Sequence, residues 1–158
     1  MSMELVYGRP GHLIRRAQQV ATALFSEACS AFDLTSVQYA ALVAIHENPG
    51  VDATRLSTLI AFDRSTLGDV LERLEHKGWI RRAASPADKR VKLLHITEPG
   101  TRLLDIVSPI ADDVQDRILA PLGHDDRITL MRLLEQLVDL HVDRARGDAA
   151  KSSIALTE

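Results

Sequence analysis

The strongest constraint on the fold of this chain is an amphipathic helical segment that runs directly into two short β-like segments. Residues 63–78 begin with Asp63, a residue type that caps helix N-termini, and end with Gly78, a residue type common just past helix C-termini. Between them, apolar residues recur at positions 67, 70, 71 and 74, which predicts one buried stripe. Residues 79–84 and 91–96 are β-like runs around the turn residues 85–88. This order predicts a recognition helix followed by a wing.

The outward face of the predicted recognition helix carries side chains that suit DNA. Ser65, Thr66 and Asp69 are short and polar near the start of the helix, where they can approach base edges in a major groove. Arg64 and Arg73 can reach phosphates or guanine. An ordinary solvated helix face would have the same composition, so the helix alone does not decide between the two.

Charge separates this segment from the rest of the chain. Residues 64–92 contain eight Lys and Arg against four Asp and Glu, a net of +4 in a chain whose net charge is −3. The remaining residues therefore carry −7. A basic patch on an acidic protein predicts that a polyanion is attracted to one surface only.

Length and composition predict one folded unit. The chain has 158 residues, of which 46% are hydrophobic and 26% are charged, which favours a compact core over disorder. No apolar run is long enough to span a bilayer, and the N-terminus lacks a signal-peptide pattern, so we expect a cytoplasmic protein with no membrane partner. The single cysteine and six scattered histidines predict no disulfide and no metal site. We also expect no cofactor and no enzyme, because phosphate-loop and nucleophile-elbow motifs are missing.

The other segments are predicted to be helices. One long helix covers residues 11–32, and Thr35 with Gln38 fits a capping box at the start of the next. Asp52 caps a short helix that forms a helix-turn-helix with the recognition helix. Thr97 caps a helix that reaches about residue 119, and a last helix spans about residues 125–146. We expect residues 148–158 to be a flexible tail.

In this order, residues 10–147 resemble the MarR family of bacterial winged-helix transcriptional regulators. The likeness is clearest in residues 88–90 and 93–100, which look like that family's wing and its strand-to-helix junction, and in residues 71–80, which look like its recognition-helix end. The resemblance implies that Arg90 enters the minor groove, that Asp88 orients basic residues of the motif, and that Ser65 and Thr66 lie in the major groove. A surface salt bridge between Asp88 and Arg90, without function, is the alternative.

We therefore predict a mainly α fold within a single domain, residues 1–147. A winged helix-turn-helix lobe with a two-stranded wing covers about residues 35–97, and helices at about 11–32 and 98–146 form a dimerisation lobe. The apolar stripes of these long helices exceed what one small lobe covers, so we expect a homodimer and a palindromic operator in double-stranded DNA. A monomeric helical bundle is the alternative. The predicted DNA-binding residues are Arg64, Ser65, Thr66, Asp69, Arg73, Lys77, Arg81, Arg82, Asp88, Lys89 and Arg90.

The resemblance also implies a small-molecule effector that releases DNA, since family members commonly bind aromatic acids between the dimerisation helices and the helix-turn-helix. An arginine at the start of the first helix can bind a carboxylate through two parallel hydrogen bonds. The effector would be an aromatic carboxylic acid or its thioester. Surface or dimer salt bridges and core positions are the alternative roles of the candidate residues, which are His12, Arg15, Arg16, Gln19, Tyr39 and His46.

Two other functions stay open. A redox-sensing regulator would use Cys29, but no Lys or Arg lies near it in the sequence and no second cysteine exists to resolve an oxidised thiol. We therefore expect Cys29 to be a buried structural residue. A DNA-binding protein without an effector is the other alternative, because a ligand cleft has no sharp sequence motif.

Overall fold

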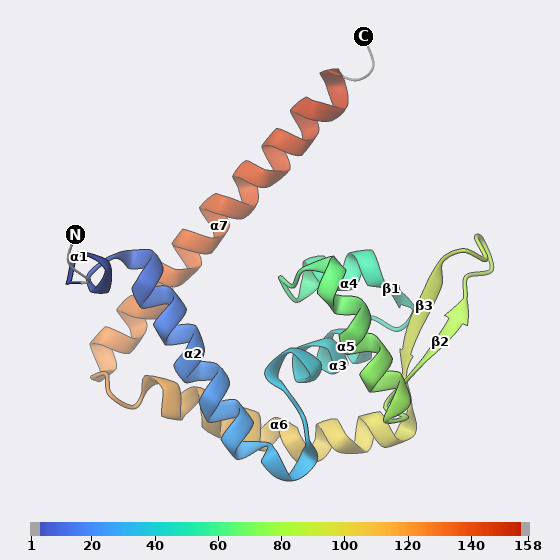
Figure 1. Cartoon of the computed structure of the whole chain (residues 1–158), viewed down its shortest axis with the longest axis horizontal. Helices are drawn as coiled ribbons and strands as arrows, with labels where there is room; N and C mark the ends of the chain where they lie inside the picture. Colours follow the sequence, from blue (N-terminus) through green and yellow to red (C-terminus); the bar gives the residue numbers. More distant parts are fainter. Residues whose placement is uncertain (1–3, 156–158) are drawn as a thin grey trace. The chain divides into compact units, whose positions relative to one another are not determined.

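The computed structural model describes the backbone of residues 4–155 and the side chains of residues 6–139. The described chain is mainly helical, as predicted, with a small antiparallel sheet (Figure 1). It forms two compact units, residues 1–118 and residues 119–158, which are described separately below.

The first unit begins with α1 (Glu4–Tyr7) and the long helix α2 (Pro10–Ala28). The prediction of one continuous helix to residue 32 is wrong in its last turn. Cys29 closes α2, and a 3-10 turn, η1 (Ser30–Phe32), leads to Asp33 in the left-handed region with φ of 49°. Phe25, Cys29 and Phe32 recur at a spacing that suits a continuous α-helix equally well, so the apolar pattern does not reveal where the helix ends.

The helix-turn-helix consists of α3 (Ser36–Glu47), α4 (Ala53–Leu59) and α5 (Arg64–His76). Each helix begins at the predicted cap. The Thr35 N–H donates to Gln38 Oε1 at 3.0 Å and the Gln38 N–H to Thr35 Oγ1 at 3.3 Å, which completes the capping box. Asp52 and Asp63 accept hydrogen bonds from the first backbone N–H groups of α4 and α5. The starts of these helices are therefore encoded locally.

The sheet has the strand order β1-β3-β2. Strands β2 (Ile80–Ala84) and β3 (Lys92–Ile96) confirm the predicted hairpin, with Ile80 opposite Ile96 and Ala84 opposite Lys92. The sequence did not reveal β1 (Val51–Asp52), which pairs with the other edge of β3 and adds a third strand. Two residues are too short to show the alternation that marks a strand in sequence.

The core of the first unit lies between the helix-turn-helix, the sheet and α6 (Glu98–Leu119). The sequence predicts apolar stripes at residues 67, 70, 71 and 74 of α5 and at residues 103, 107, 110 and 114 of α6. Both stripes are buried, except that Val70 and Ile110 are only partly so. Fully buried side chains come from elements far apart in sequence: Leu42, Ile45, Leu56, Leu67, Leu74, Leu94, Val107 and Val114. Burial of these side chains fixes α5 and the wing relative to one another.

The base of the wing is tied to the start of α6. Gly78, with φ of 73°, ends α5 as predicted, and its carbonyl accepts a 2.6 Å hydrogen bond from the Thr97 hydroxyl. The Thr97 N–H donates to Trp79 O at 3.0 Å, and the Gly100 N–H donates to Thr97 Oγ1 at 3.2 Å. One threonine thus caps α6 and anchors the hairpin.

Large apolar side chains stay exposed on the long helices. The sequence predicts an apolar stripe on the first helix at residues 13, 17, 20, 24 and 28. Of these, Leu13 is 55% and Val20 is 51% exposed on α2. The second unit contains α7 (His124–Ala155), on which Ile128 and Val138 are each 57% exposed. Its backbone is helical through Ala155, so the predicted end near residue 146 is wrong. No helix in the described part of the chain is long and apolar enough to cross a membrane.

Candidate nucleic-acid interface

The start of α5 presents two hydroxyl groups held by the cap residue. The Ser65 hydroxyl donates to the Asp63 carboxylate, and the Thr66 hydroxyl donates to Asp63 O at 3.1 Å. The Ser65 hydroxyl and the Thr66 N–H hold the pKa of Asp63 below its usual range. Both side chains are exposed, and each hydroxyl oxygen keeps lone pairs for an external donor. The predicted major-groove residues are therefore oriented in advance and accessible.

The wing tip is shaped by Asp88. Its Oδ1 accepts the Arg90 N–H at 2.9 Å, and its backbone carbonyl accepts the Val91 N–H at 2.9 Å. Among the ion pairs of the described residues, none joins the side chains of Asp88 and Arg90. Asp88 thus orients the motif through the main chain, and the Arg90 side chain stays exposed at the tip with that of Lys89.

A basic cleft of about 400 Å³ lies between the start of α4, the start of α5 and the hairpin. Arg64, Arg82 and Arg90 line it together with Lys92, although they come from a helix, a strand and a loop. The Arg64 guanidinium donates to the Thr54 hydroxyl on α4, and Arg82 Nε lies 3.0 Å from Glu75 Oε2. Converging cations at this surface suit the phosphates of a nucleic acid.

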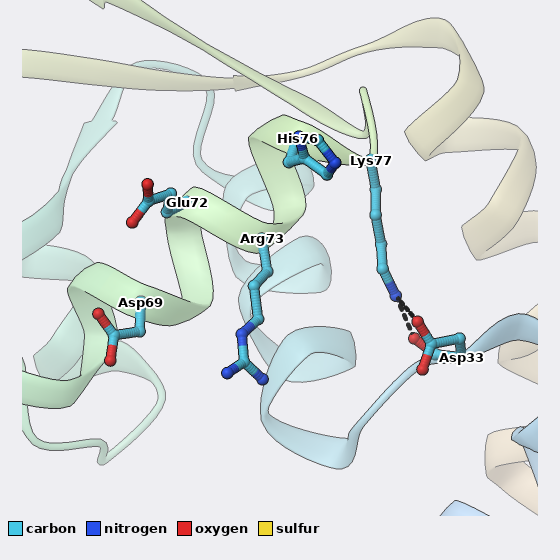
Figure 2. A pocket seen from close by; sticks show the side chains of 6 residues that line it. All are labelled: Asp33, Asp69, Glu72, Arg73, His76 and Lys77. Atoms are coloured by element: carbon cyan, nitrogen blue, oxygen red, sulfur yellow. Dashed lines mark hydrogen bonds and ion pairs between the residues drawn. The ribbon is translucent and has the colours of Figure 1, made fainter.

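The remaining predicted DNA-binding residues are placed differently. Arg81 is exposed on β2, outside the residues that line the basic cleft. Asp69 and Arg73 are exposed on α5, where they also line a polar pocket of about 640 Å³. Figure 2 shows that the Lys77 side chain in this pocket is directed at Asp33, away from Asp69. Lys77 Nζ lies 2.7 Å from Asp33 Oδ2, so the structure gives its ammonium group a partner within the protein.

Two further cavities are lined by residues of both α2 and α3. The larger, of about 560 Å³, is lined by Gln18 and Thr22 of α2, apolar residues including Phe62 and Val70, and Arg73 of α5. The smaller, of about 270 Å³, lies between α2, α3 and α6 and shares Gln18 and Thr22. Polar and apolar residues share the lining of both cavities, and the larger one carries the Asp69 carboxylate as well as the Arg73 guanidinium.

Neither of these two cavities is lined by a predicted effector-binding residue. Arg15, Arg16, Gln19 and His46 are exposed, whereas His12 is half-buried against Tyr7 with its Nδ1 unpartnered. Tyr39 packs on Phe25, and its hydroxyl donates to Ser108 Oγ at 3.3 Å, which is the core position given as its alternative role. Gln18 and Thr22, which sequence reasoning missed, are polar residues one helical turn apart beside the predicted candidates.

Cys29 is fully buried, and burial raises the pKa of its thiol. It is the buried residue that we expected. Among the residues that the structure describes, no three His, Cys, Asp or Glu side chains gather as metal ligands.

A recognition helix with exposed polar groups, a wing with an arginine at its tip and a basic cleft between them define a winged-helix DNA-binding regulator. The chain belongs to the MarR family: the family's sequence profile matches residues 34–92. The transcriptional repressor NicR of Pseudomonas putida is 30% identical over 129 residues, which cover 82% of each chain. MarR proteins are transcriptional regulators and not enzymes.

Solved structures agree with this assignment. BpsR of Bordetella bronchiseptica, whose DNA binding is regulated by 6-hydroxynicotinic acid, matches with a TM-score of 0.79 and 27% identity over 84% of this chain and 95% of its own. The repressor CouR bound to a 23-mer DNA duplex matches with a TM-score of 0.77 and 27% identity over 87% of this chain and 98% of its own.

Proposed function

We propose that this protein is a cytoplasmic repressor that binds a palindromic operator as a homodimer and leaves it when a small aromatic acid binds. The observation that carries the DNA-binding part is the convergence of Arg64, Arg82 and Arg90 on one cleft beside the recognition helix. In this proposal Arg90 enters the minor groove next to the major groove that receives Ser65 and Thr66, because a narrow minor groove attracts arginine. The structure of CouR bound to a 23-mer DNA duplex supports duplex DNA as the ligand of this fold.

Homodimerisation is supported by the apolar surface of the long helices. Leu13, Ile14 and Val20 on α2 are each about half exposed, and so are Ile128 and Met131 on α7. Large apolar side chains that stay exposed on a helix favour an interaction site on that helix. A second copy would cover the same helices on both chains and would place two recognition helices about one DNA turn, ~34 Å, apart.

The aromatic acid is supported by the two cavities lined by residues of α2 and α3 and by the relatives. The cavities offer apolar walls and polar groups, and the larger one also offers the Arg73 guanidinium. BpsR responds to 6-hydroxynicotinic acid. A redox function through Cys29 has less support, because its thiol is enclosed and its pKa is raised.

The test combines selection, hydrodynamics and ligand screening. The protein selects duplexes from a random-sequence pool, and the recovered site is expected to be palindromic. Sedimentation is expected to give twice the 17.4 kDa chain mass. Thermal unfolding is then followed with aromatic carboxylates and their thioesters, starting with 6-hydroxynicotinic acid, since a ligand that binds the native state raises Tm. A stable monomer with full affinity would contradict the dimer, and no stabilisation by any of these acids would remove the proposed effector class.

A further inference from the structure

Lys77 lies where three parts of the first unit meet. It is the C-cap residue of α5, and its Nζ contacts Asp33 in the connection between η1 and α3. The same Nζ lies 4.7 Å above the ring of Trp79, the residue before β2. The Lys77 ammonium at the end of the recognition helix thus contacts both the segment that follows α2 and the base of the wing. Figure 2 shows the contact with Asp33.

The contact with Asp33 is double. Lys77 Nζ lies 2.7 Å from Asp33 Oδ2, and it also donates to the backbone carbonyl of Asp33. This hydrogen bond and the positive charge of Lys77 hold the pKa of Asp33 below its usual range. The Lys77 side chain is only 23% exposed, whereas most DNA-facing candidates on α5 are open to solvent. The Lys77 ammonium is therefore directed at Asp33, a surface residue whose side chain is 94% exposed.

Asp33 lies in the connection between η1 and α3. Its left-handed backbone turns the chain from η1 towards α3, and Thr35 and Ser36 just beyond it line the larger cavity. Asp33 thus joins the α2–α3 connection to Lys77 at the end of the recognition helix through their contact.

We propose that Lys77 is a positioning residue for DNA binding, which holds the end of the recognition helix and the wing base to Asp33 instead of contacting a phosphate. This inference rests on the DNA-binding function proposed above. It predicts that Asp33, which carries a negative charge, supports the binding of a polyanion. A phosphate-contact role for Lys77 predicts the opposite, because removal of a neighbouring carboxylate would then strengthen binding.

The two roles predict opposite changes in DNA affinity for Asp33→Asn: a positioning role predicts weaker binding, and a phosphate-contact role predicts tighter binding. Asparagine tolerates the left-handed backbone, so the substitution removes the charge without straining the turn. Asp113→Asn, an exposed residue on α6, makes the same change of charge elsewhere and is the matched control. Affinity is measured by gel shift on a duplex selected by the wild-type protein, over a range of salt concentrations.

We expect Asp33→Asn and Lys77→Ala each to weaken binding by about two- to fivefold, in the range of a surface ion pair. Asp33→Asn leaves the contact of Lys77 with the backbone carbonyl in place, whereas Lys77→Ala removes both contacts. The double variant should therefore bind like Lys77→Ala alone, because residue 33 then has no ammonium partner. The slope of log affinity against log salt concentration should stay unchanged in Lys77→Ala. In Lys89→Ala this slope should fall by about one, the amount expected for the loss of one phosphate contact. Tighter or unchanged binding by Asp33→Asn, or a reduced slope in Lys77→Ala, would overturn the proposal.

Trp79 gives a readout that needs no DNA, because it is the only tryptophan of the chain. If Asp33 holds Lys77 over the ring, Asp33→Asn should move the fluorescence of Trp79 towards that of Lys77→Ala, and Asp113→Asn should leave it unchanged. Fluorescence of Asp33→Asn identical to that of the wild type would refute the positioning role even if the protein selected no DNA sequence. Failure of the selection alone would count against the proposed function and not against this contact.

Discussion

Gly100 on α6 lies against Trp79 at the base of the wing so closely that a Cβ atom on Gly100 would be 2.2 Å from the Trp79 carbonyl oxygen. The same Trp79 carbonyl oxygen accepts a hydrogen bond from the Thr97 N–H. The start of α6 is therefore held close to the backbone of Trp79. Gly100, which ends the family-like motif at residues 93–100, is therefore needed because there is no room for a side chain and not because of its backbone conformation.

Gly100→Ala should destabilise the protein by about 1–3 kcal/mol, because the added methyl group meets backbone that cannot rotate away. Gly68→Ala is the control: Gly68 is exposed inside α5 and a Cβ there meets nothing within 4 Å. It should stabilise the helix by about 1 kcal/mol. Urea unfolding of both variants checks the prediction, and equal stability of Gly100→Ala and wild type would contradict the close contact.

Arg90→Ala should reduce affinity for the selected operator by about 1–3 kcal/mol, because a specific groove contact is lost. The sedimentation coefficient should stay unchanged, because no apolar residue of the long helices is altered. Arg102→Ala is the control. Arg102 is an exposed residue of α6 that pairs with Glu98, and its loss should leave binding unaltered. Gel-shift titrations at one fixed salt concentration measure both, and equal loss in the two variants would exclude a specific role for the wing tip.

Asp63→Ala should lower Tm at neutral pH, since the side chain caps α5 and its pKa is lowered in the folded state. A lowered folded pKa means that the charged cap stabilises the protein above the unfolded pKa of about 3.9. This stabilisation is lost as pH falls through the still lower folded pKa. Thermal unfolding of the variant and the wild type should therefore converge in acid. A difference in Tm that does not change with pH would show that the carboxylate charge is not involved.

If Arg16 forms a bidentate pair with the effector's carboxylate, Arg16→Ala should preserve DNA binding but abolish the release of DNA by an aromatic acid. Arg16→Lys should have the same effect to a lesser degree. Arg73, which lines the larger cavity, is the competing anchor in the structure. Calorimetry with the acid found in the stability screen decides between them. Equal ligand affinity in Arg16→Ala and wild type would move the anchor away from Arg16.

Cys29 should not react with a thiol reagent until the protein unfolds, because it is enclosed and its raised pKa leaves little thiolate at neutral pH. Operator binding should be the same before and after exposure to hydrogen peroxide. Loss of binding that Cys29→Ala prevents would restore the redox-sensing alternative.

Local sequence signals determined the helix boundaries, the hairpin and the buried faces of two helices. The caps at Thr35, Asp52, Asp63 and Thr97 and the glycine after α5 mark helix boundaries correctly, because capping involves residues three or four positions apart. The hairpin follows from its alternating β-like runs and turn residues. The apolar period also predicts which faces of α5 and α6 are buried.

Tertiary structure decided what depends on residues far apart in the chain. The third strand β1, the convergence of Arg64, Arg82 and Arg90, and the cavities lined by Gln18 and Thr22 have no local pattern. Lys77 shows the difference most clearly. In the sequence it is one more cation in a basic segment, but in the fold its ammonium group meets Asp33, 44 positions away. Charge and periodicity are properties of neighbouring residues, whereas the partner of a long side chain is set by packing.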